Sequence, residues 1–372
     1  MDITQAQTLL GGLSPERFMK RHWQKKPLLV RQAMPGFAPL LSRAALFDLA
    51  ADEAAESRLI TQRGGWRLRH GPIARRSLPP LSQPQWTLLV QGVDLHDERV
   101  HALMQQFRFI PDARLDDVMI SYASDGGGVG PHFDSYDVFL LQAAGRRRWR
   151  IGRQKDLSLV QGLPLKILAD FQPEEEYLLE PGDMLYLPPR WAHDGVAEGG
   201  ECMTYSIGFR QPAQGEVGAE MLQRMAEEAV DMLGDTAYRD PDQPAVTAPA
   251  RVPGAMLAFA REAVDRAARD PQQLAMLLGE WLSEPKPMVG FQPGRTPSGA
   301  GAVALDRRTR MLYDDHHVFI NGESYLGSGR DAVLMRQLAD QRRLGATERA
   351  RLSAGAAELL GQWIEAGWAH ES

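Results

Sequence analysis

Two histidines and one aspartate have the spacing and setting of metal ligands. His132 and Asp134 are two positions apart in the stretch 130–152, GPHFDSYDVFLLQAAGRRRWRIG, and alternate residues of a β-strand point to the same face. His193 follows a short strand that lies between a Gly-Asp turn and a double proline. Two imidazoles and one carboxylate are the facial ligand set of non-haem Fe(II) oxygenases, which leaves coordination positions open for a co-substrate and dioxygen. The pattern therefore predicts an iron site.

The alternative is that these histidines are structural, because an isolated histidine usually satisfies its hydrogen bonds inside the protein and binds no metal. The setting favours the metal site. His132 follows the segment GGGVGP, and His193 follows a PGD turn. The remaining histidines have no such partner pattern and are expected to be surface or core residues: His22, His70, His96, His101, His316, His317 and His370.

An arginine cluster follows His132, and strand parity separates its members. Arg147 shares a face with Trp149 and Ile151, so this apolar face is expected to point into the protein. The arginines on the opposite face are Arg146, Arg148 and Arg150. A guanidinium inside the protein needs an anionic partner. A dicarboxylate co-substrate that chelates the metal through one end would supply that anion at its other end.

Ser121 is a second candidate for binding the co-substrate. It lies on the predicted strand MISYA, and its hydroxyl could donate to the same carboxylate as Arg147. A serine that only occupies a strand position is the equally weighted alternative. The glycine run 126–128, just before His132, is predicted to be either a flexible loop at the mouth of the site or a plain turn.

These candidate residues lie in a region of β-type segments that runs from residue 96 to 212. Glycine and proline turns separate the segments VMISYA, YDVFLLQ, RRRWRIG, EYLLEPGDMLYLPP and MTYSIGF. Short strands at this spacing predict a barrel or a sandwich. Residues 1–95 have a mixed pattern, with a helix expected after Ser14, where Pro15 takes the first helical position.

Beyond residue 213 the pattern becomes helical. An apolar stripe at 217–233 predicts a helix, the proline-rich segment 240–254 predicts a linker, and a helix over 255–269 is followed by another that begins after Asp270. The apolar surface of these helices exceeds what a domain edge normally exposes, so we expect them to form a homodimer. Packing on their own barrel is the alternative.

The last segment, residues 300–372, is predicted to form a separate module. Asn321-Gly322 indicates a hairpin turn, and helices are expected at 330–341 and 347–367.

Composition excludes several classes of protein. The chain has 372 residues, 44% of them hydrophobic, which is enough for two or three folded domains. A net charge of −6 argues against a general nucleic-acid coat and favours a basic protein partner. The single cysteine, Cys202, excludes an internal disulfide framework and a cysteine-based zinc cluster. Because no apolar run is long enough to span a membrane, a cytoplasmic protein without membrane contact is expected.

The motifs GGGVGPHFDSYDVF, GRRRWRIG, EPGDMLYLPPRWAHDG and MTYSIGF resemble the JmjC-type ribosomal oxygenases. They are most similar to the bacterial branch that hydroxylates an arginine of large-subunit ribosomal protein sixteen. The resemblance covers residues 20–215 and is looser over the C-terminal third. Relatives that act on histidine generally carry lysine at the position of Arg147, so the arginine favours the bacterial branch.

The resemblance implies an α+β fold: a double-stranded β-helix, or cupin, core with a helical dimerisation region and a C-terminal winged-helix-like module. The expected boundaries are 1–95 for an N-terminal region packed on the barrel, 96–212 for the catalytic barrel, 213–290 for the dimerisation helices and 300–372 for the winged-helix-like module.

The resemblance also implies a ligand set. His132, Asp134 and His193 would hold Fe(II), while Arg147, with Ser121 nearby, would bind 2-oxoglutarate. The implied substrate is the ribosomal protein.

Two other functions are left open by the residues. One is a JmjC-type demethylase or a hydroxylase of another residue such as histidine, since demethylation uses the same metal ligands and co-substrate. The other is a non-enzymatic cupin and winged-helix binding protein. Residues 303–372 are not strongly basic, which argues against nucleic-acid binding by that module without settling it.

Overall fold

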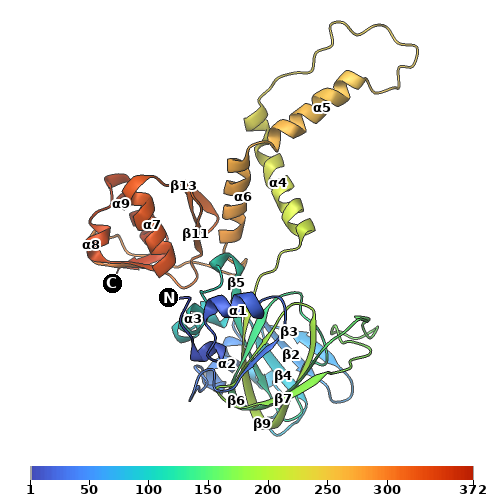
Figure 1. The fold of residues 1–372 in the computed structure, drawn as a ribbon, viewed down its shortest axis with the longest axis vertical. Helices are drawn as coiled ribbons and strands as arrows, with labels where there is room; N and C mark the ends of the chain where they lie inside the picture. The colour runs from blue at the N-terminus through green and yellow to red at the C-terminus, as the bar shows by residue number, and fades with distance from the viewer. Residues whose placement is uncertain (1, 372) are drawn as a thin grey trace. The chain divides into compact units, whose positions relative to one another are not determined.

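The structure is a computed structural model that describes residues 2–371. The chain forms two compact units, Met1–Gln211 and Pro212–Ser372, each of which has its own core (Figure 1). Within the described residues, none of the helices combines the length and the apolar character that crossing a membrane requires.

The first unit is mainly β-structure with short helices at its N-terminal side. Its helices and 3-10 turns are η1 (Thr8–Leu10), α1 (Pro15–Arg21), α2 (Arg43–Leu49), η2 (Arg75–Ser77), η3 (Val93–Leu95), α3 (Glu98–Gln105) and η4 (Asp112–Arg114). Its strands are β1 (Leu28–Val30), β2 (Ser57–Thr61), β3 (Arg67–His70), β4 (Trp86–Val90), β5 (Leu115–Ala123), β6 (Val138–Arg153), β7 (Glu175–Leu179), β8 (Met184–Leu187) and β9 (Trp191–Phe209).

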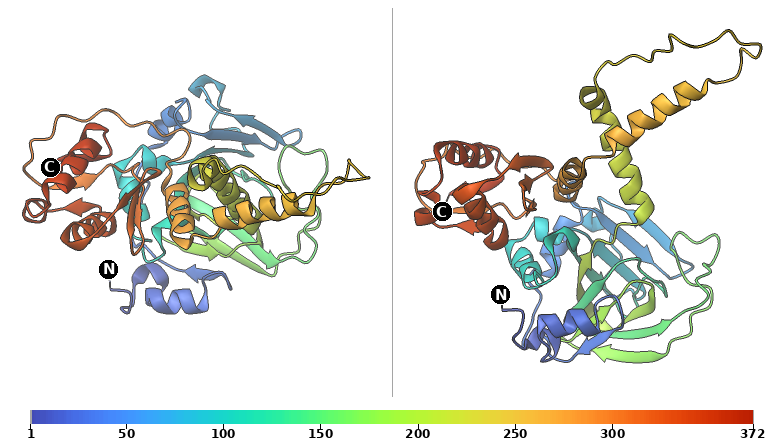
Figure 2. Two further views of the ribbon diagram at one scale, coloured as in Figure 1. Left: turned by 90° about the horizontal axis from the view of Figure 1, so that it is seen from above. Right: turned by 45° about the horizontal axis from the view of Figure 1, so that its top comes forward.

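These strands form one curled antiparallel sheet (Figure 2). Their order is β1-β8-β6-β9-β5-β4-β2-β3; in addition, β7 pairs with residues 147–151 of β6, while β8 pairs with residues 138–141. The long strands β6 and β9 pair with each other over most of their length, and their shared register is interrupted between Gln142 and Arg146. The sheet curls into the predicted double-stranded β-helix, which confirms the expected fold class. Strands β1 to β4, from residues 1–95, extend the same sheet.

The start of α1 follows the sequence prediction. Ser14 caps the helix by accepting the N–H of Arg17 at 3.3 Å, and Pro15 occupies the first helical position. The helix packs on the barrel through Phe18, which is fully buried and lies against the rings of Phe139 and Tyr186. Aromatic packing therefore joins the N-terminal helix to the barrel.

The prediction of separate strands around the arginine cluster was wrong. Residues 138–153 form the single continuous strand β6, although Gly145 within it has a φ of +63°. A Cβ at Gly145 would lie 2.0 Å from the carbonyl oxygen of Glu201, so only glycine fits where the neighbouring strand passes. The glycine marks an irregularity inside a strand, and the chain continues past it.

The second unit contains three long helices, a linker and a small α+β module. Its helices are α4 (Gln214–Leu233), α5 (Gly254–Ala267), α6 (Pro271–Ser283), α7 (Gly329–Gln341), α8 (Ala346–Arg349) and α9 (Ala354–Glu365). Its strands are β10 (Val303–Leu305), β11 (Met311–Tyr313), β12 (His317–Ile320), β13 (Glu323–Leu326), β14 (Arg343–Leu344) and β15 (Ala369–Glu371).

The sequence predicted the start of α6 and the turn between β12 and β13 in this unit, but it was wrong about the last helix. Asp270 caps α6 by accepting the N–H of Gln272 at 2.9 Å, and the Asn321-Gly322 turn joins β12 to β13, as expected. The helix predicted over 347–367 is instead divided into α8 and α9. The hydroxyl of Ser353 accepts the N–H of Ala356 and so caps the start of α9. Because Ser353 bonds to the backbone as a cap, the helix does not continue through it from α8.

Candidate metal and co-substrate site

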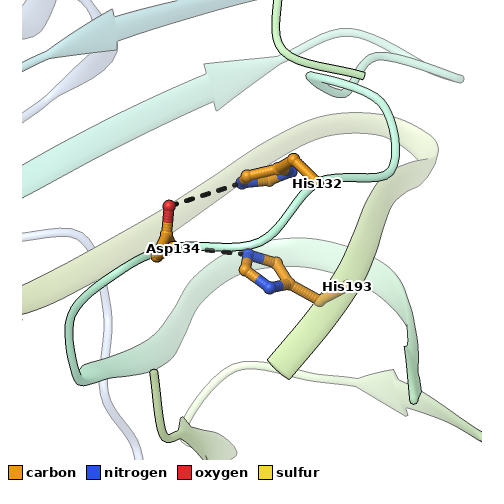
Figure 3. Close-up of side chains that lie close together, drawn as sticks. All are labelled: His132, Asp134 and His193. Carbon is orange, nitrogen blue, oxygen red and sulfur yellow. Dashed lines mark ion pairs between the residues drawn. The ribbon is translucent and has the colours of Figure 1, made fainter. Parts of the chain in front are cut away.

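His132, Asp134 and His193 lie together inside the barrel and point toward one another (Figure 3). Nε2 of His132 lies 3.9 Å from one carboxylate oxygen of Asp134, and Nε2 of His193 lies 3.6 Å from the other. One ligand atom from each residue lies within 4.8 Å of the others. This spacing allows three donors to bind one ion on a single face, as the sequence predicted for these residues.

Hydrogen bonds orient both imidazoles for metal binding. Nδ1 of His132 lies 2.8 Å from the carbonyl oxygen of Gly130, and Nδ1 of His193 lies 2.9 Å from that of Trp191. A carbonyl only accepts, so each Nδ1 carries a proton, and in the neutral imidazole the lone pair is then on Nε2. Both lone pairs are therefore available on the side of Asp134.

Burial keeps His193 neutral. Its side chain is 4% exposed, and desolvation together with the nearby His132 lowers its pKa to about 4. An imidazole binds metal only in its deprotonated form. The lone pair of His193 is therefore available well below neutral pH.

The backbone around the two histidines has a different form from the predicted one. His132 and Asp134 are not in a regular strand: His132 forms an isolated bridge with His193, and β6 begins only at Val138. The strand predicted between the Gly-Asp turn and the double proline is β8, and His193 follows it as expected, but His193 itself lies inside the next strand, β9. His132 and Asp134 do point to the same place, but the strand from which this was predicted is absent there.

The glycine run before His132 is closely packed. Gly127 and Gly128 are buried; a Cβ on Gly127 would lie 2.4 Å from the carbonyl oxygen of Trp86, and one on Gly128 would lie 2.6 Å from that of Gly195. Gly127 also accepts the N–H of Ala197 at 2.9 Å. The N–H of Gly127 donates to the carbonyl oxygen of Ser124 at 2.8 Å, which confirms the predicted turn over residues 124–127, and the glycines let the chain pass close to β4 and β9.

Arg147 is buried in the same cavity as the two histidines and Asp134, as strand parity predicted. The cavity measures about 380 Å³. Arg147 is 4% exposed; its Nε donates to Sγ of Cys202 at 3.4 Å, and its Nη2 is buried without a hydrogen-bond partner. A buried guanidinium nitrogen without a partner is costly unless a ligand pairs with it. The cavity thus contains a site for an anion beside the candidate metal ligands.

The other arginines of the cluster lie outside this cavity. Arg146 is exposed, whereas Arg148 pairs with Glu198 and Glu176, and Arg150 pairs with Asp194. These pairs are partly exposed and are therefore worth little to stability. Arg148 and Arg150 thus form ion pairs between neighbouring strands, which the alternation of strand residues did not predict.

Ser121 lines the same cavity and is 3% exposed, but its hydroxyl lies 3.4 Å from the carbonyl oxygen of Thr204. That distance is long for a hydrogen bond donated by a hydroxyl. The hydroxyl can therefore turn toward a ligand.

Further cavity residues were missed by sequence reasoning. Asp117 and Met119 precede Ser121 on β5 and share its face, so strand parity applied to this strand would have found them. Asp116 and Tyr136 also line the cavity, and they carried no comparable signal. The wall therefore contains carboxylates in addition to Asp134.

Comparison with known families identifies both units. Residues 102–217 match the JmjC domain, and residues 266–370 match a ROXA-like winged helix. The second match begins ahead of the module expected at 300–372, because it includes α6. That helix packs closely on the module, where Gly279 faces the ring of Phe319 and Ser283 accepts the N–H of Gly322.

Several known proteins match this chain over most of its length. The chain is 38% identical to the ribosomal protein uL16 3-hydroxylase of Escherichia coli over 85% of its own length and 86% of that protein. The X-ray structure of E. coli ycfD matches with a TM-score of 0.83 and 31% identity, over 96% of this chain and 98% of that one. A structure of the E. coli ribosomal oxygenase YcfD in complex with cobalt and 2-oxoglutarate matches at a TM-score of 0.81 and 30% identity, over 96% and 98% of the two chains.

The fold and the site define a JmjC-type oxygenase, an enzyme of the 2-oxoglutarate-dependent dioxygenase class. Within that class, the chain belongs to the ribosomal oxygenase family.

Proposed function

We propose that this protein is an Fe(II)- and 2-oxoglutarate-dependent oxygenase that hydroxylates an arginine side chain of the ribosomal protein uL16, the large-subunit protein sixteen. The observation that carries the proposal is the triad His132, Asp134 and His193 in one cavity with the unpartnered guanidinium of Arg147. The names of the E. coli relatives, a uL16 3-hydroxylase and a ribosomal oxygenase solved with cobalt and 2-oxoglutarate, support the substrate and the co-substrate.

The proposed roles of the residues follow from their contacts. His132, Asp134 and His193 would hold Fe(II), because their donor atoms lie close together and hydrogen bonds orient both imidazoles. Arg147 would bind the distal carboxylate of 2-oxoglutarate, assisted by the hydroxyl of Ser121. With dioxygen, the iron and 2-oxoglutarate together supply an oxidant able to insert oxygen into an unactivated C–H bond.

The cavity wall supports a cationic substrate side chain. Asp116 and Asp117 line it from β5, and Asp117 is only 3% exposed. Asp116 already pairs with Arg210 at 3.4 Å, and a guanidinium that enters this cavity could add a charge-assisted hydrogen bond to these carboxylates. Tyr136, which is 40% exposed, supplies an aromatic surface in the same wall.

Apolar side chains limit water at the reacting centre. Val138, Leu140 and Trp149 line the cavity from β6, and each is at most 5% exposed. An apolar wall leaves few groups that hold water beside the metal ligands, so the substrate would displace the rest when it enters. The residues of the chain therefore bind, orient and shield the reacting groups.

We also propose a division of the chain that matches this activity. Residues 96–212 would be the catalytic barrel, with 1–95 packed on it, 213–290 would form a homodimer, and 300–372 would be the winged-helix-like module. The dimer is supported by large exposed apolar side chains on α4 and α5, which include Leu222, Val230, Leu257 and Val264. Action on a ribosomal protein is consistent with work in the cytoplasm.

The test is incubation of the purified protein with Fe(II), 2-oxoglutarate and recombinant uL16. The expected result is the gain of one oxygen atom on an arginine, located by tandem mass spectrometry, with one succinate formed for each oxygen added. A uL16 variant with that arginine replaced by lysine is the matched control. Oxygen placed on a histidine, or loss of a methyl group from a methylated peptide without hydroxylation of uL16, would replace the proposal with one of its alternatives.

A further inference from the structure

A chain of buried polar groups joins Ser121 to Arg147 behind the cavity. The Ser121 hydroxyl lies 3.4 Å from the carbonyl oxygen of Thr204, whose own hydroxyl donates to Oε1 of Gln142 at 2.9 Å. Nε2 of Gln142 lies 3.2 Å from Sγ of Cys202, which also accepts from Nε of Arg147 at 3.4 Å. All five side chains are at most 4% exposed.

Within this row of polar groups, Cys202 is the residue that contacts the guanidinium of Arg147. The contact with its sulfur occupies Nε of Arg147, so the edge made by Nε and Nη2 cannot bind a carboxylate with both of its nitrogens. The terminal edge, which includes the unpartnered Nη2, remains for that purpose. The position of the sulfur therefore decides which edge of the guanidinium faces a ligand.

Gln142 fixes the sulfur in turn. Its Nε2 donates to the carbonyl oxygen of Ala144 at 2.7 Å as well as to Cys202, and its Oε1 accepts from Thr204. A side-chain amide that uses its donors and its acceptor has little freedom to rotate. Gln142 thereby connects the irregular part of β6 to β9 and holds Cys202 beside Arg147.

Cys202 lies in the irregular stretch of β9, between Glu198, which pairs with Arg146, and Met203, which pairs with Ala144. The pairing of β6 with β9 shifts between Gln142 and Ala144 and again between Ala144 and Arg146. Such irregularities re-aim side chains beside functional sites. Beyond the irregular stretch the regular ladder resumes, and there Arg147 pairs with Ala197.

We propose that Cys202, held by Gln142, is a positioning residue that sets the orientation of Arg147 and so the affinity for the distal carboxylate of the co-substrate. This inference rests on the proposed function, in which Arg147 binds 2-oxoglutarate. A thiol suits the role because sulfur is a weak, neutral acceptor. A carboxylate at the same place would pair fully with the guanidinium and compete with the co-substrate.

The experiment is calorimetric titration of the Co(II)-loaded full-length protein with two ligands. 2-Oxoglutarate reaches both the metal and Arg147, whereas oxalate binds the metal and is too short to reach the arginine. In Cys202→Ala the Kd for 2-oxoglutarate is expected to rise about three- to tenfold, the effect of one lost hydrogen bond. The Kd for oxalate is expected to stay unchanged. Cys202→Ser keeps an acceptor and is expected to restore most of the affinity.

Two matched measurements keep the result specific. Met203→Leu changes the adjacent buried residue, which belongs to the main apolar core, and is expected to leave both Kd values unchanged. If Cys202→Ala does not fold, Cys202→Val, which fills the space without an acceptor, replaces it in the same comparison.

The possible outcomes separate this inference from the proposed function. Failure of the wild-type protein to bind 2-oxoglutarate would overturn the proposed function. Normal wild-type binding with an equal Kd in Cys202→Ala would overturn the positioning role alone. A parallel loss of affinity for both ligands would show general damage to the site, and it would overturn the positioning role as well.

Discussion

His132 and His193 exchange both of their backbone hydrogen bonds, with N···O distances of 2.9 and 2.8 Å, and their rings lie 4.2 Å apart. They come from segments separated by the whole of β6, β7 and β8, yet the bridge fixes their Cα atoms as neighbours. Main-chain atoms thus hold these two candidate metal ligands in place. Such preorganisation reduces the cost of ordering the ligands.

Removal of one ligand should therefore abolish tight metal binding. In His193→Ala the remaining two side chains form an incomplete site, and we expect Co(II) affinity to fall by at least about 100-fold. Titration followed by the visible spectrum of cobalt measures this loss. His70→Ala removes an exposed histidine of β3 and should bind Co(II) like the wild type. Equal cobalt affinity in the two variants would remove His193 from the site.

The arginine cluster provides a comparison between neighbours. Arg147→Ala should raise the Kd for 2-oxoglutarate on the order of 30-fold or more, because a buried charge-assisted pair is lost. Arg147→Lys should bind with intermediate affinity, since the ammonium keeps the charge but loses the planar fork. Arg146→Ala is the control and should change the Kd less than about threefold, because Arg146 is exposed. The reverse order would show that Arg147 does not bind the co-substrate.

The close approach of Trp149 to Gly195 predicts a steric effect two residues from a metal ligand. A Cβ on Gly195 would lie 2.5 Å from the Trp149 ring, so Gly195→Ala should lower the free energy of unfolding by about 1 to 3 kcal/mol. Thermal unfolding measures the change. Gly215→Ala is the matched control, because a Cβ there meets nothing within 4 Å. Unchanged stability in Gly195→Ala would mean that the ring and the strand are less closely packed than described.

The helices α4 and α5 should mediate dimer formation. Leu257 and Val264 lie on α5 and are 61% and 65% exposed within this chain. The double variant Leu257→Glu, Val264→Glu should shift the molecular mass measured by light scattering from dimer to monomer. Leu326→Glu changes an equally apolar residue that is 85% exposed on β13, and it should leave the dimer intact. A wild-type protein that is monomeric at micromolar concentration would contradict the dimer.

Asp183 predicts a specific pH dependence of stability. Burial opposes its ionisation, but hydrogen bonds from the N–H of Gln32, from Arg31 and from the N–H of Glu180 lower its pKa below 3.8. A carboxyl whose pKa is lower in the folded state stabilises the fold above its unfolded pKa, and this contribution is lost as the pH falls through the folded value.

The measurement compares wild type with Asp183→Asn. At about pH 7 the variant should be less stable by about 1 to 3 kcal/mol in urea unfolding, because the hydrogen bonds to a charged acceptor are weakened. The difference should remain constant down to about pH 5 and shrink below about pH 4. A difference that grows on acidification would show the opposite sign of the shift.

Sequence reasoning found the residues with the strongest local patterns. Residue types that bind metals, in segments flanked by turns, indicated His132, Asp134 and His193. The alternation of strand residues placed Arg147 inside the protein, where the structure has it. The same rule was not extended to β5 and so missed Asp117. The alternation of residues along β5 is present in the sequence and would have indicated Asp117.

Other features depend on contacts that no local pattern contains. The contact of Cys202 with Arg147 lies where the register between β6 and β9 is irregular, next to the close approach of Glu201 to Gly145. The continuity of β6 was missed because a glycine in a strand usually indicates a break. These properties arise from the way distant strands pass one another.

The ladder between β6 and β9 has a consequence for the length of co-substrate that the site accepts. His193 is paired with Ile151, and Arg147 is paired with Ala197, four positions along the same two strands. Under the proposed roles, this interval fixes the distance between the metal site and the guanidinium of Arg147. A shift of one residue would turn the arginine to the outer face. The distance between the metal site and the arginine can therefore change only in steps of two residues, about 7 Å. A chain with this ladder cannot adapt gradually to a dicarboxylate that is one carbon longer or shorter.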